Sequence, residues 1–142
     1  MRISDVLRQK GPAVATIAPG ATVHELVSTL RAHNIGAMVV TDGDAVVGIV
    51  SERDIVRKLD EQGAALLAAP VSAIMTRDVF TCGPDDTVDS LAETMTERRI
   101  RHMPVLRDGR LAGIVSIGDV VKSHIRQLEN DREQLESYIV QG

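Results

Sequence analysis

The stretch GIVSERD at residues 48–54 joins an apolar, strand-like run to a Ser-x-x-Asp segment that opens an apolar-periodic stretch. Ser-x-x-Asp before such a stretch is typical of a capping box, which satisfies free backbone groups at a helix N-terminus. The same arrangement returns as GIVSIGD at residues 113–119. The serine and aspartate of each stretch therefore cap a helix, bind a ligand, or do both.

The chain is an internal duplication. A shift of 65 positions aligns residues 16–57 with residues 81–122 without a gap, and fifteen of the 42 aligned pairs are identical. Upstream, residues 5–7 resemble residues 73–75, and the first copy carries three extra residues before its first threonine. A repeat of this kind predicts two copies of one supersecondary unit that pack together.

Each copy is predicted to fold in the order β-α-β-β-α, which makes the chain a mixed α/β (α+β) protein. Thr22 and Thr87 precede apolar residues at helical spacing and are predicted N-caps of the first helix of each copy. Asp-Gly pairs at residues 42–43 and 108–109 predict hairpin turns. The predicted strands lie near residues 13–17, 37–40 and 46–50 in the first copy, and near 78–82, 103–106 and 111–115 in the second.

The last helix is predicted to continue beyond the second copy. From Ser116 to Ile139 there is no proline, and apolar residues follow alternating four- and three-residue steps that Arg132 interrupts. Two interpretations stay open: a solvated helix that packs on its own domain, or a helix that meets a partner chain. The predicted division is a first domain at 1–62, a packed linker at 63–70, a second domain at 71–127 and a helical extension at 128–142.

Composition and motifs exclude several functions. The net charge of −4 disfavours a general nucleic-acid partner or an anionic membrane. Cys82 is the single cysteine, which suits a reducing compartment, and no apolar run has signal-peptide or membrane-spanning length. The cytoplasm is therefore the expected location. Because no P-loop, GxGxxG, GxSxG, HExxH or Cys-pair motif is present, we expect no enzyme activity.

The duplicated pattern resembles a tandem pair of cystathionine-β-synthase (CBS) domains, also called a Bateman module, as in small stand-alone bacterial proteins. IGAMVV at residues 35–40 with GIVSERD, and RRIRHMPV at residues 98–105 with GIVSIGD, carry the resemblance. It implies two repeats packed with pseudo-twofold symmetry, and two clefts between them that bind AMP, ADP, ATP, NAD or S-adenosylmethionine. It also implies a homodimer that regulates an unknown downstream protein by conformational change.

The chemistry of Ser-x-x-Asp is compatible with such a ligand. Free N–H groups and the dipole at a helix N-terminus favour a phosphate. A carboxylate repels phosphate and is better used to accept hydrogen bonds from ribose hydroxyls. Both copies keep the serine and the aspartate, while residues 52–53 and 117–118 between them differ. We therefore expect two non-equivalent sites whose capping residues also bind.

The second copy carries the better phosphate clamp. Arg101 and His102 lie beside its predicted cleft and offer charge-assisted hydrogen bonds, whereas the first copy answers with Arg53. No metal-ligand set surrounds His102, although bound phosphates could share a Mg²⁺ ion. The resemblance implies nucleotide binding by Thr16, Ile35, Gly36, Ala37, Ser51, Arg53 and Asp54 in the first copy, and by Thr81, Ile100, Arg101, His102, Pro104, Ser116 and Asp119 in the second; Met38 and Met103 are core residues that could edge an adenine pocket.

The function that we expect is a regulatory module that senses AMP, ADP, ATP or NAD. The alternatives are a module that binds S-adenosylmethionine and a structural adaptor that acts through the C-terminal helix without a nucleotide.

Overall fold

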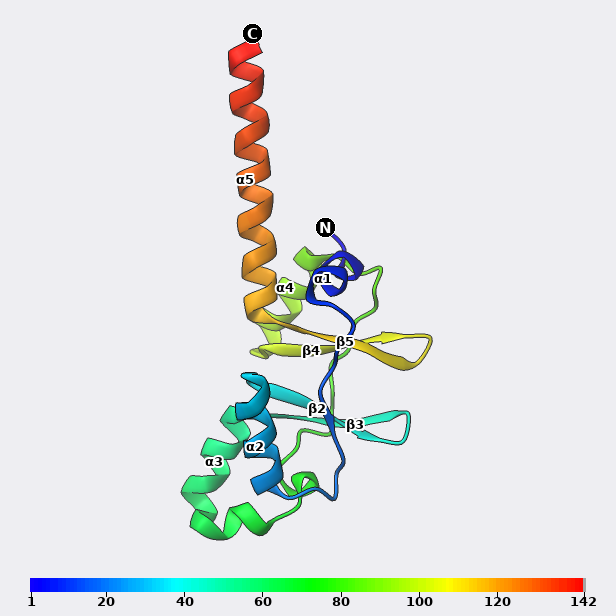
Figure 1. Ribbon diagram of the computed structural model, residues 1–142, viewed down its shortest axis with the longest axis vertical. Coiled ribbons are helices and arrows are strands. Elements are labelled where there is room, and N and C mark those ends of the chain that lie inside the picture. The colour runs from blue at the N-terminus through cyan, green and yellow to red at the C-terminus, as the bar shows by residue number, and fades with distance from the viewer. Residues whose placement is uncertain (142) are drawn as a thin grey trace.

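The computed structural model describes residues 1–141 and shows two stacked repeats from which one long helix projects (Figure 1). The predicted mixed α/β architecture with a C-terminal helix is confirmed. The elements in chain order are α1 (Ile3–Lys10), β1 (Thr16–Ile17), α2 (Val23–His33), β2 (Ala37–Asp42), β3 (Ala45–Ser51), α3 (Glu52–Gln62), η1 (Gly63–Ala68), η2 (Val71–Ala73), α4 (Val88–Arg98), β4 (His102–Arg107), β5 (Arg110–Ser116) and α5 (Ile117–Gln141).

The sheets of the two repeats differ in their first strand. In the first repeat β1 pairs parallel to β2, and β2 pairs antiparallel to β3. In the second repeat β4 and β5 form a two-stranded sheet. The predicted strand at 78–82 is wrong, because only Cys82 pairs, in an isolated parallel bridge to Val105. The Cys82 N–H donates to the Pro104 carbonyl at 3.0 Å, so one bridge keeps the place that β1 holds in the first repeat.

The two hairpin turns occupy equivalent positions in the repeats, but only one of them lies where the Asp-Gly pairs predicted it. The second turn is formed by Asp108 and Gly109 as predicted, with φ of 53° and 78°. The first turn is shifted by one residue to residues 43–44, because β2 continues to Asp42, which pairs with Ala45. Glycine at position 43 accepts the φ of 61° that this turn requires.

The predicted helix caps are present. The Thr22 Oγ1 accepts from the Glu25 N–H at 3.1 Å, and the Thr87 Oγ1 accepts from the Ser90 N–H at 3.1 Å. Each bond satisfies one of the free N–H groups at a helix N-terminus. The same two caps therefore fix the start of α2 and of α4.

Each hydrophobic core includes a segment from outside its own repeat. Ile3 and Val6 of α1 are buried in the core of the second repeat. Val71 and Ile74, which follow the linker, are buried in the core of the first repeat. The linker forms the predicted packed helical turn, with Leu66 fully buried. The boundaries at 62 and 71 thus separate the two copies of the repeat in the sequence. The two cores do not follow these boundaries, because the segment that precedes each repeat packs in the core of the other.

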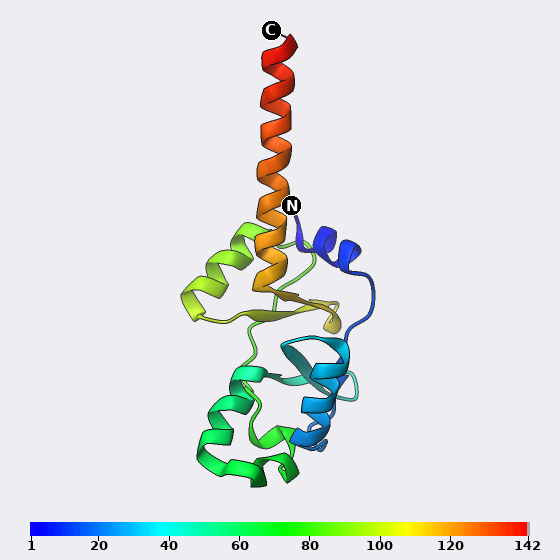
Figure 2. The same cartoon turned by 60° about the vertical axis from the view of Figure 1, so that its left-hand side comes forward.

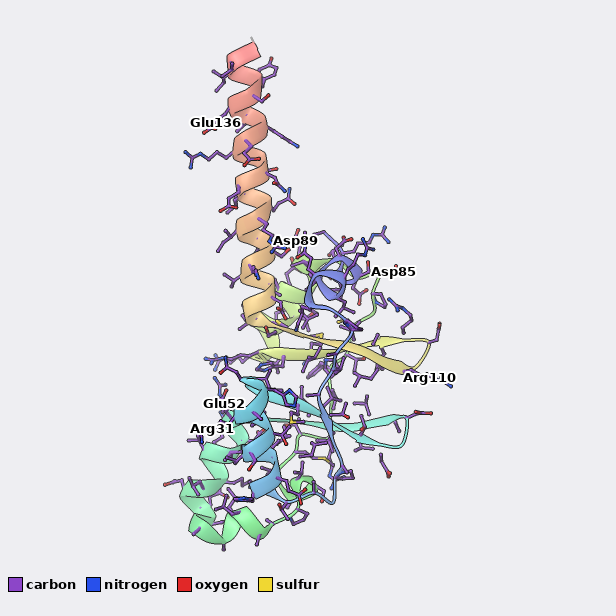
Figure 3. All side chains as sticks on the ribbon, viewed as in Figure 1. Arg31, Glu52, Asp85, Asp89, Arg110 and Glu136 are labelled. Atoms are coloured by element: carbon purple, nitrogen blue, oxygen red, sulfur yellow. The ribbon has the colours of Figure 1, made fainter. Side chains whose placement is uncertain are left out.

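The helix α5 leaves the body of the molecule after its first turns (Figures 1 and 2). Near its start Val120 is buried in the second core, and the His124 Nε2 lies 2.9 Å from Asp89 Oδ1. Farther out, the Leu135 and Ile139 side chains are 63% and 73% exposed, and Glu136 also lies on this projecting part (Figure 3). Packing on its own domain therefore applies only to the start of α5.

The predicted extension at 128–142 is described as far as residue 141, and residue 142 lies outside the described residues. None of the described helices combines the length and the apolar composition that crossing a membrane requires.

Candidate functional site

Two cavities lie between the repeats, and each is lined by residues of both. We name the cavity of about 330 Å³ cavity A and the cavity of about 540 Å³ cavity B. Cavity A is lined by Gly36, Ala37, Ile49, Val50, Ser51, Glu52, Arg53, Asp54, Arg57, Thr76, Asp78, Val79, Phe80, Arg99, Ile100, Arg101 and His102. Cavity B is lined by Leu7, Lys10, Gly11, Ala13, Val14, Ala15, His33, Asn34, Ile35, Gly36, Ala37, His102, Gly113, Ile114 and Ser116.

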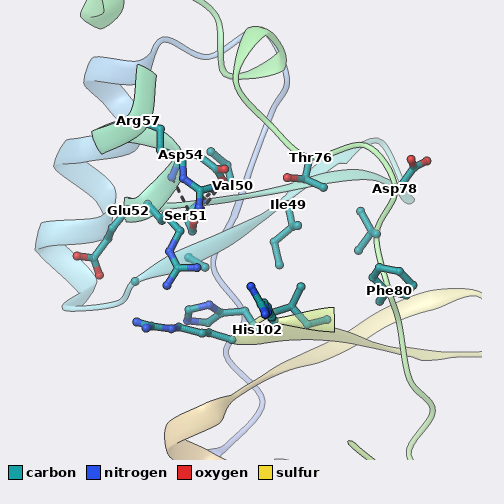
Figure 4. A pocket seen from close by; sticks show the side chains of 17 residues that line it. Ile49, Val50, Ser51, Glu52, Asp54, Arg57, Thr76, Asp78, Phe80 and His102 are labelled. Atoms are coloured by element: carbon teal, nitrogen blue, oxygen red, sulfur yellow. Dashed lines mark hydrogen bonds between the residues drawn. The ribbon is translucent and has the colours of Figure 1, made fainter. Parts of the chain in front are cut away.

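The first Ser-x-x-Asp segment forms both a helix cap and part of the wall of cavity A. Ser51 ends β3, and its N–H donates to Asp54 Oδ2 at 2.9 Å while its hydroxyl donates to the same oxygen at 3.2 Å. The Asp54 N–H in turn lies 3.4 Å from the Ser51 Oγ. Both side chains border the cavity, opposite His102 (Figure 4). Among the described residues no donor reaches Asp54 Oδ1, so this oxygen is left for a ligand hydroxyl.

Cavity A collects basic side chains from both repeats. Arg53 and Arg57 come from α3 of the first repeat, and Arg99 and Arg101 come from the segment that joins α4 to β4 in the second. The sequence assigned Arg53 and Arg101 to different sites, whereas the structure places them in one cavity. The reason is that the repeats face each other, so that the start of β4 lies opposite the end of β3. Four guanidinium groups against three carboxylates make this wall suitable for an anionic ligand.

The two cavities share one wall. Gly36, Ala37 and His102 line both. A Cβ at position 36 would lie 2.7 Å from Glu52 Oε1 of the same repeat and at an ordinary contact distance of 3.7 Å from His102 Cε1, so glycine here leaves room for the Glu52 side chain. Burial, together with the charge of Lys10, lowers the pKa of His102 below its ordinary value of 6.5. The imidazole is therefore a neutral hydrogen-bonding group at pH 7.

The second Ser-x-x-Asp segment has a partner that the first lacks. Asp119 Oδ2 accepts from the Ser116 N–H at 2.8 Å and from the Ser116 hydroxyl at 3.0 Å, as in the first repeat. The same oxygen accepts from the Lys10 ammonium at 2.8 Å. Burial raises the pKa of Asp119, but the hydrogen bonds from Lys10 and Ser116 outweigh this and hold it below its ordinary value. Asp119 is therefore ionised and already paired with Lys10, which lines cavity B.

The structure brings most of the sequence-predicted site residues to the cavities. Eight of them line cavity A: Gly36, Ala37, Ser51, Arg53, Asp54, Ile100, Arg101 and His102. Ile35 and Ser116 line cavity B, and Asp119 reaches it through Lys10.

Six predicted site residues line neither cavity, and one of them is Asp119, which is connected to cavity B only by its bond to Lys10. Met38 and Met103 are each 1% exposed and belong to the two cores, so the core interpretation holds for both. Pro104 is also buried, and its carbonyl accepts from the Cys82 N–H. Thr16 and Thr81 are exposed on their segments.

Several lining residues were missed by the sequence analysis. Phe80, one of two aromatic residues in the chain, borders cavity A and has the Arg98 guanidinium carbon 4.8 Å from its ring centroid. An aromatic face at this place can carry a cation or a purine base. Lys10 lies outside both motifs, and no spacing rule connects it to Asp119. Among the described residues no group of three or more His, Cys, Asp or Glu side chains is arranged to hold a metal ion.

Comparisons with known proteins agree with this geometry. The family model of the CBS domain matches residues 3–61 and 71–125. A CBS-domain-containing protein of Agrobacterium tumefaciens has 49% sequence identity and a TM-score of 0.85, over 87% of this chain and 99% of that one. A mitochondrial CBS domain-containing protein of Arabidopsis thaliana is 36% identical over 99% of this chain and 72% of its own length.

The fold and the paired cavities therefore define a tandem CBS-domain module, and the chain belongs to the CBS-domain family. A related structure contains adenosine compounds. It is a CBS domain pair solved in complex with 5′-methylthioadenosine and S-adenosyl-L-methionine, with 28% identity and a TM-score of 0.79 over 89% of this chain and 98% of that one.

Proposed function

We propose that this chain is a regulatory module that binds adenosine-containing nucleotides, namely AMP, ADP, ATP or NAD, in two non-equivalent clefts. It acts in the cytoplasm as a homodimer, catalyses no reaction, and signals to a protein partner through the relative orientation of its repeats. A Mg²⁺ ion could accompany the phosphates of the ligand. The observation that carries the proposal is the convergence of Ser51, Asp54, Arg53 and Arg101 on one cavity between the repeats.

The groups of cavity A match the parts of such a ligand. Asp54 offers Oδ1 to ribose hydroxyls, while its Oδ2 is held by Ser51. Arg53 and Arg101 are exposed cations on opposite sides of the cavity and suit phosphate oxygens. The relatives support the adenosine part, because a related domain pair was solved with two adenosine compounds. S-adenosylmethionine is the alternative ligand on the same ground.

A thermal-shift panel on ligand-stripped protein tests the proposal. AMP, ADP, ATP, NAD and S-adenosylmethionine are each added in large excess, with and without Mg²⁺. A ligand at about 100 times its dissociation constant stabilises the folded protein by about 2.7 kcal/mol. If none of the five compounds raises the melting temperature, the proposal is wrong.

Arginine variants then locate the site. Arg101→Gln and Arg53→Gln are expected to weaken binding of a phosphorylated ligand by roughly tenfold or more, because each removes a charge-assisted hydrogen bond. The matched control is Arg110→Gln, which removes an exposed arginine at the start of β5, outside both cavities (Figure 3). Equal affinity in all three variants would remove cavity A from the proposal. We avoid Asp54 variants here because they also remove a helix cap.

The exposed apolar stripe of α5 favours the second candidate function, a structural adaptor. Ile125, Leu128, Leu135 and Ile139 lie at coiled-coil spacing and are each more than half exposed. In a nucleotide-binding module this stripe would serve the homodimer; in an adaptor it would serve the partner alone. The ligand panel separates the two functions.

A further inference from the structure

Helix α1 carries Lys10 from the start of the chain into the second repeat. Ile3 and Val6 anchor the helix in the second core, and Leu7 packs where Gly113 has no side chain. The Lys10 ammonium, at the end of this helix, donates to the Ile114 carbonyl at 2.7 Å and to Asp119 Oδ2 at 2.8 Å. Apolar packing holds the helix, and two hydrogen bonds hold the end of the Lys10 side chain, so the ammonium is fixed at the wall of cavity B.

Cavity A has a backbone amide where cavity B has this ammonium. The carbonyl of Ile49, which is the repeat counterpart of Ile114, accepts from the Thr76 N–H at 2.8 Å. Two residues, 76–77, separate Met75 from Asp78, whereas five residues, 8–12, separate Leu7 from Ala13. The longer segment after Leu7 therefore places the Lys10 ammonium against the Ile114 carbonyl, where the shorter segment after Met75 places a neutral backbone N–H against the Ile49 carbonyl.

Lys10 supplies the positive charge of cavity B. Among the described residues that line cavity B, no other side chain is permanently charged. An ammonium has three N–H groups, and two of those of Lys10 are bonded to protein oxygens, which leaves one for a ligand. Its side chain is 35% exposed, against 18% for Asp119. A ligand in cavity B therefore meets the cation more readily than the carboxylate.

We propose that Lys10 makes cavity B selective for an adenosine compound that carries a phosphate group beside the ribose. The inference deepens the proposed function and rests on it. Without Lys10, the ionised Asp119 would repel a phosphate placed at the N-terminus of α5. With Lys10 bonded to it, Asp119 has its charge balanced beside the cavity, and the third N–H of the ammonium binds the phosphate as a point charge.

Calorimetric titration of AMP and of the uncharged 5′-methylthioadenosine tests the assignment on the full chain. The variants are Lys10→Met, which keeps the length of the side chain, and Lys10→Arg, which keeps its charge. Arg8→Met on the same helix is the control, because Arg8 lines neither cavity. An added Arg101→Gln change in each variant weakens cavity A and so identifies the signal of cavity B.

Lys10→Met should weaken AMP binding in cavity B by roughly ten- to a hundred-fold and leave 5′-methylthioadenosine within about threefold. Lys10→Arg and Arg8→Met should bind AMP nearly as the wild type does. If Lys10→Met weakens both compounds equally, Lys10 is only structural and the inference is overturned; unchanged AMP binding overturns it as well. If the wild type binds neither compound in cavity B, the inference is overturned, whereas the proposed function fails only if all five compounds of the thermal-shift panel fail.

Discussion

Replacement of Gly113 by alanine tests the packing that carries α1 onto the second repeat. A Cβ built at position 113 lies 2.5 Å from the Leu7 Cδ2, 3.3 Å from its Cδ1 and 3.4 Å from its Cγ. Carbon atoms in contact are normally about 3.5–4.0 Å apart, so Leu7 must move by roughly 1 Å. Overpacking of this kind costs about 1–3 kcal/mol of unfolding free energy. The atoms that must move all belong to the Leu7 side chain, which packs on the second repeat.

The Leu7→Ala change removes the atoms that clash. The single variant Leu7→Ala loses apolar contacts, but Gly113→Ala added to it should cost little, because the new methyl group enters the vacated space. The two changes should therefore be non-additive, with a coupling energy of about 1–3 kcal/mol in the favourable direction. Urea unfolding of the wild type, both single variants and the double variant gives this energy. Additive costs within about 0.5 kcal/mol would refute the proposed contact.

Gly48→Ala is the matched change in the first repeat and should cost more. Its Cβ would lie 2.6 Å from the Met75 Sδ and 3.0 Å from the Thr76 carbonyl oxygen. The methionine can move, but the carbonyl accepts from the Ile49 N–H at 3.0 Å, so its displacement also breaks a backbone bond. Nucleotide binding in cavity B should suffer in Gly113→Ala, and binding in cavity A in Gly48→Ala.

Three further predictions concern pH, backbone strain and assembly. Burial lowers the pKa of His102, so below pH 6.5 this side chain binds more protons in the unfolded chain than in the folded one. The free energy of unfolding should therefore fall as the pH drops below 6.5. The accompanying fall in the urea midpoint should be smaller in His102→Gln. Arg99 has a left-handed φ of 55°, whereas its repeat counterpart is Asn34, with a φ of 52°, and asparagine tolerates this region. Arg99→Asn should therefore raise the free energy of unfolding by up to about 1 kcal/mol and weaken phosphate binding in cavity A. A lower melting temperature would contradict the expected gain in stability. Because the α5 stripe is the surface available to the proposed homodimer, Leu135→Glu should lower the mass measured by light scattering towards that of a monomer, whereas Gln134→Glu should not. A dimer that survives Leu135→Glu does not use this stripe.

The duplication made most of the fold predictable. Local chemistry fixes the caps at Thr22 and Thr87, the hairpins and the capping boxes, and each of these depends only on residues a few positions apart. The strand at 78–82 failed because its place in the sheet is set by tertiary pairing, which in the second repeat is reduced to Cys82. The turn at Gly43 shifted for a related reason, since the length of β2 decides which residues remain for the turn.

The sequence predicted clefts between the repeats, but it did not predict which residues line each cavity. Ser-x-x-Asp at the start of two helices indicated anion sites, but the partner of each depends on how the repeats face each other. No local pattern shows that Arg101 joins Arg53 in one cavity. Lys10 was hidden for a stronger reason, because its partner Asp119 is 109 positions away and belongs to the other repeat. Contacts between exchanged segments leave no periodic trace in the sequence.

The exchange of segments explains how a duplicated chain can hold two different sites. Each cavity takes the serine of one Ser-x-x-Asp segment from one repeat and part of its facing wall from the other. A change in residues 52–57 of the first repeat and a change in residues 98–102 of the second therefore act on cavity A together. Cavity B also receives the segment before the first repeat, and with it Lys10, which cavity A lacks. Two arginine-rich segments in one cavity and a single lysine in the other thus follow from one duplicated scaffold, although the two cavities share the wall formed by Gly36, Ala37 and His102.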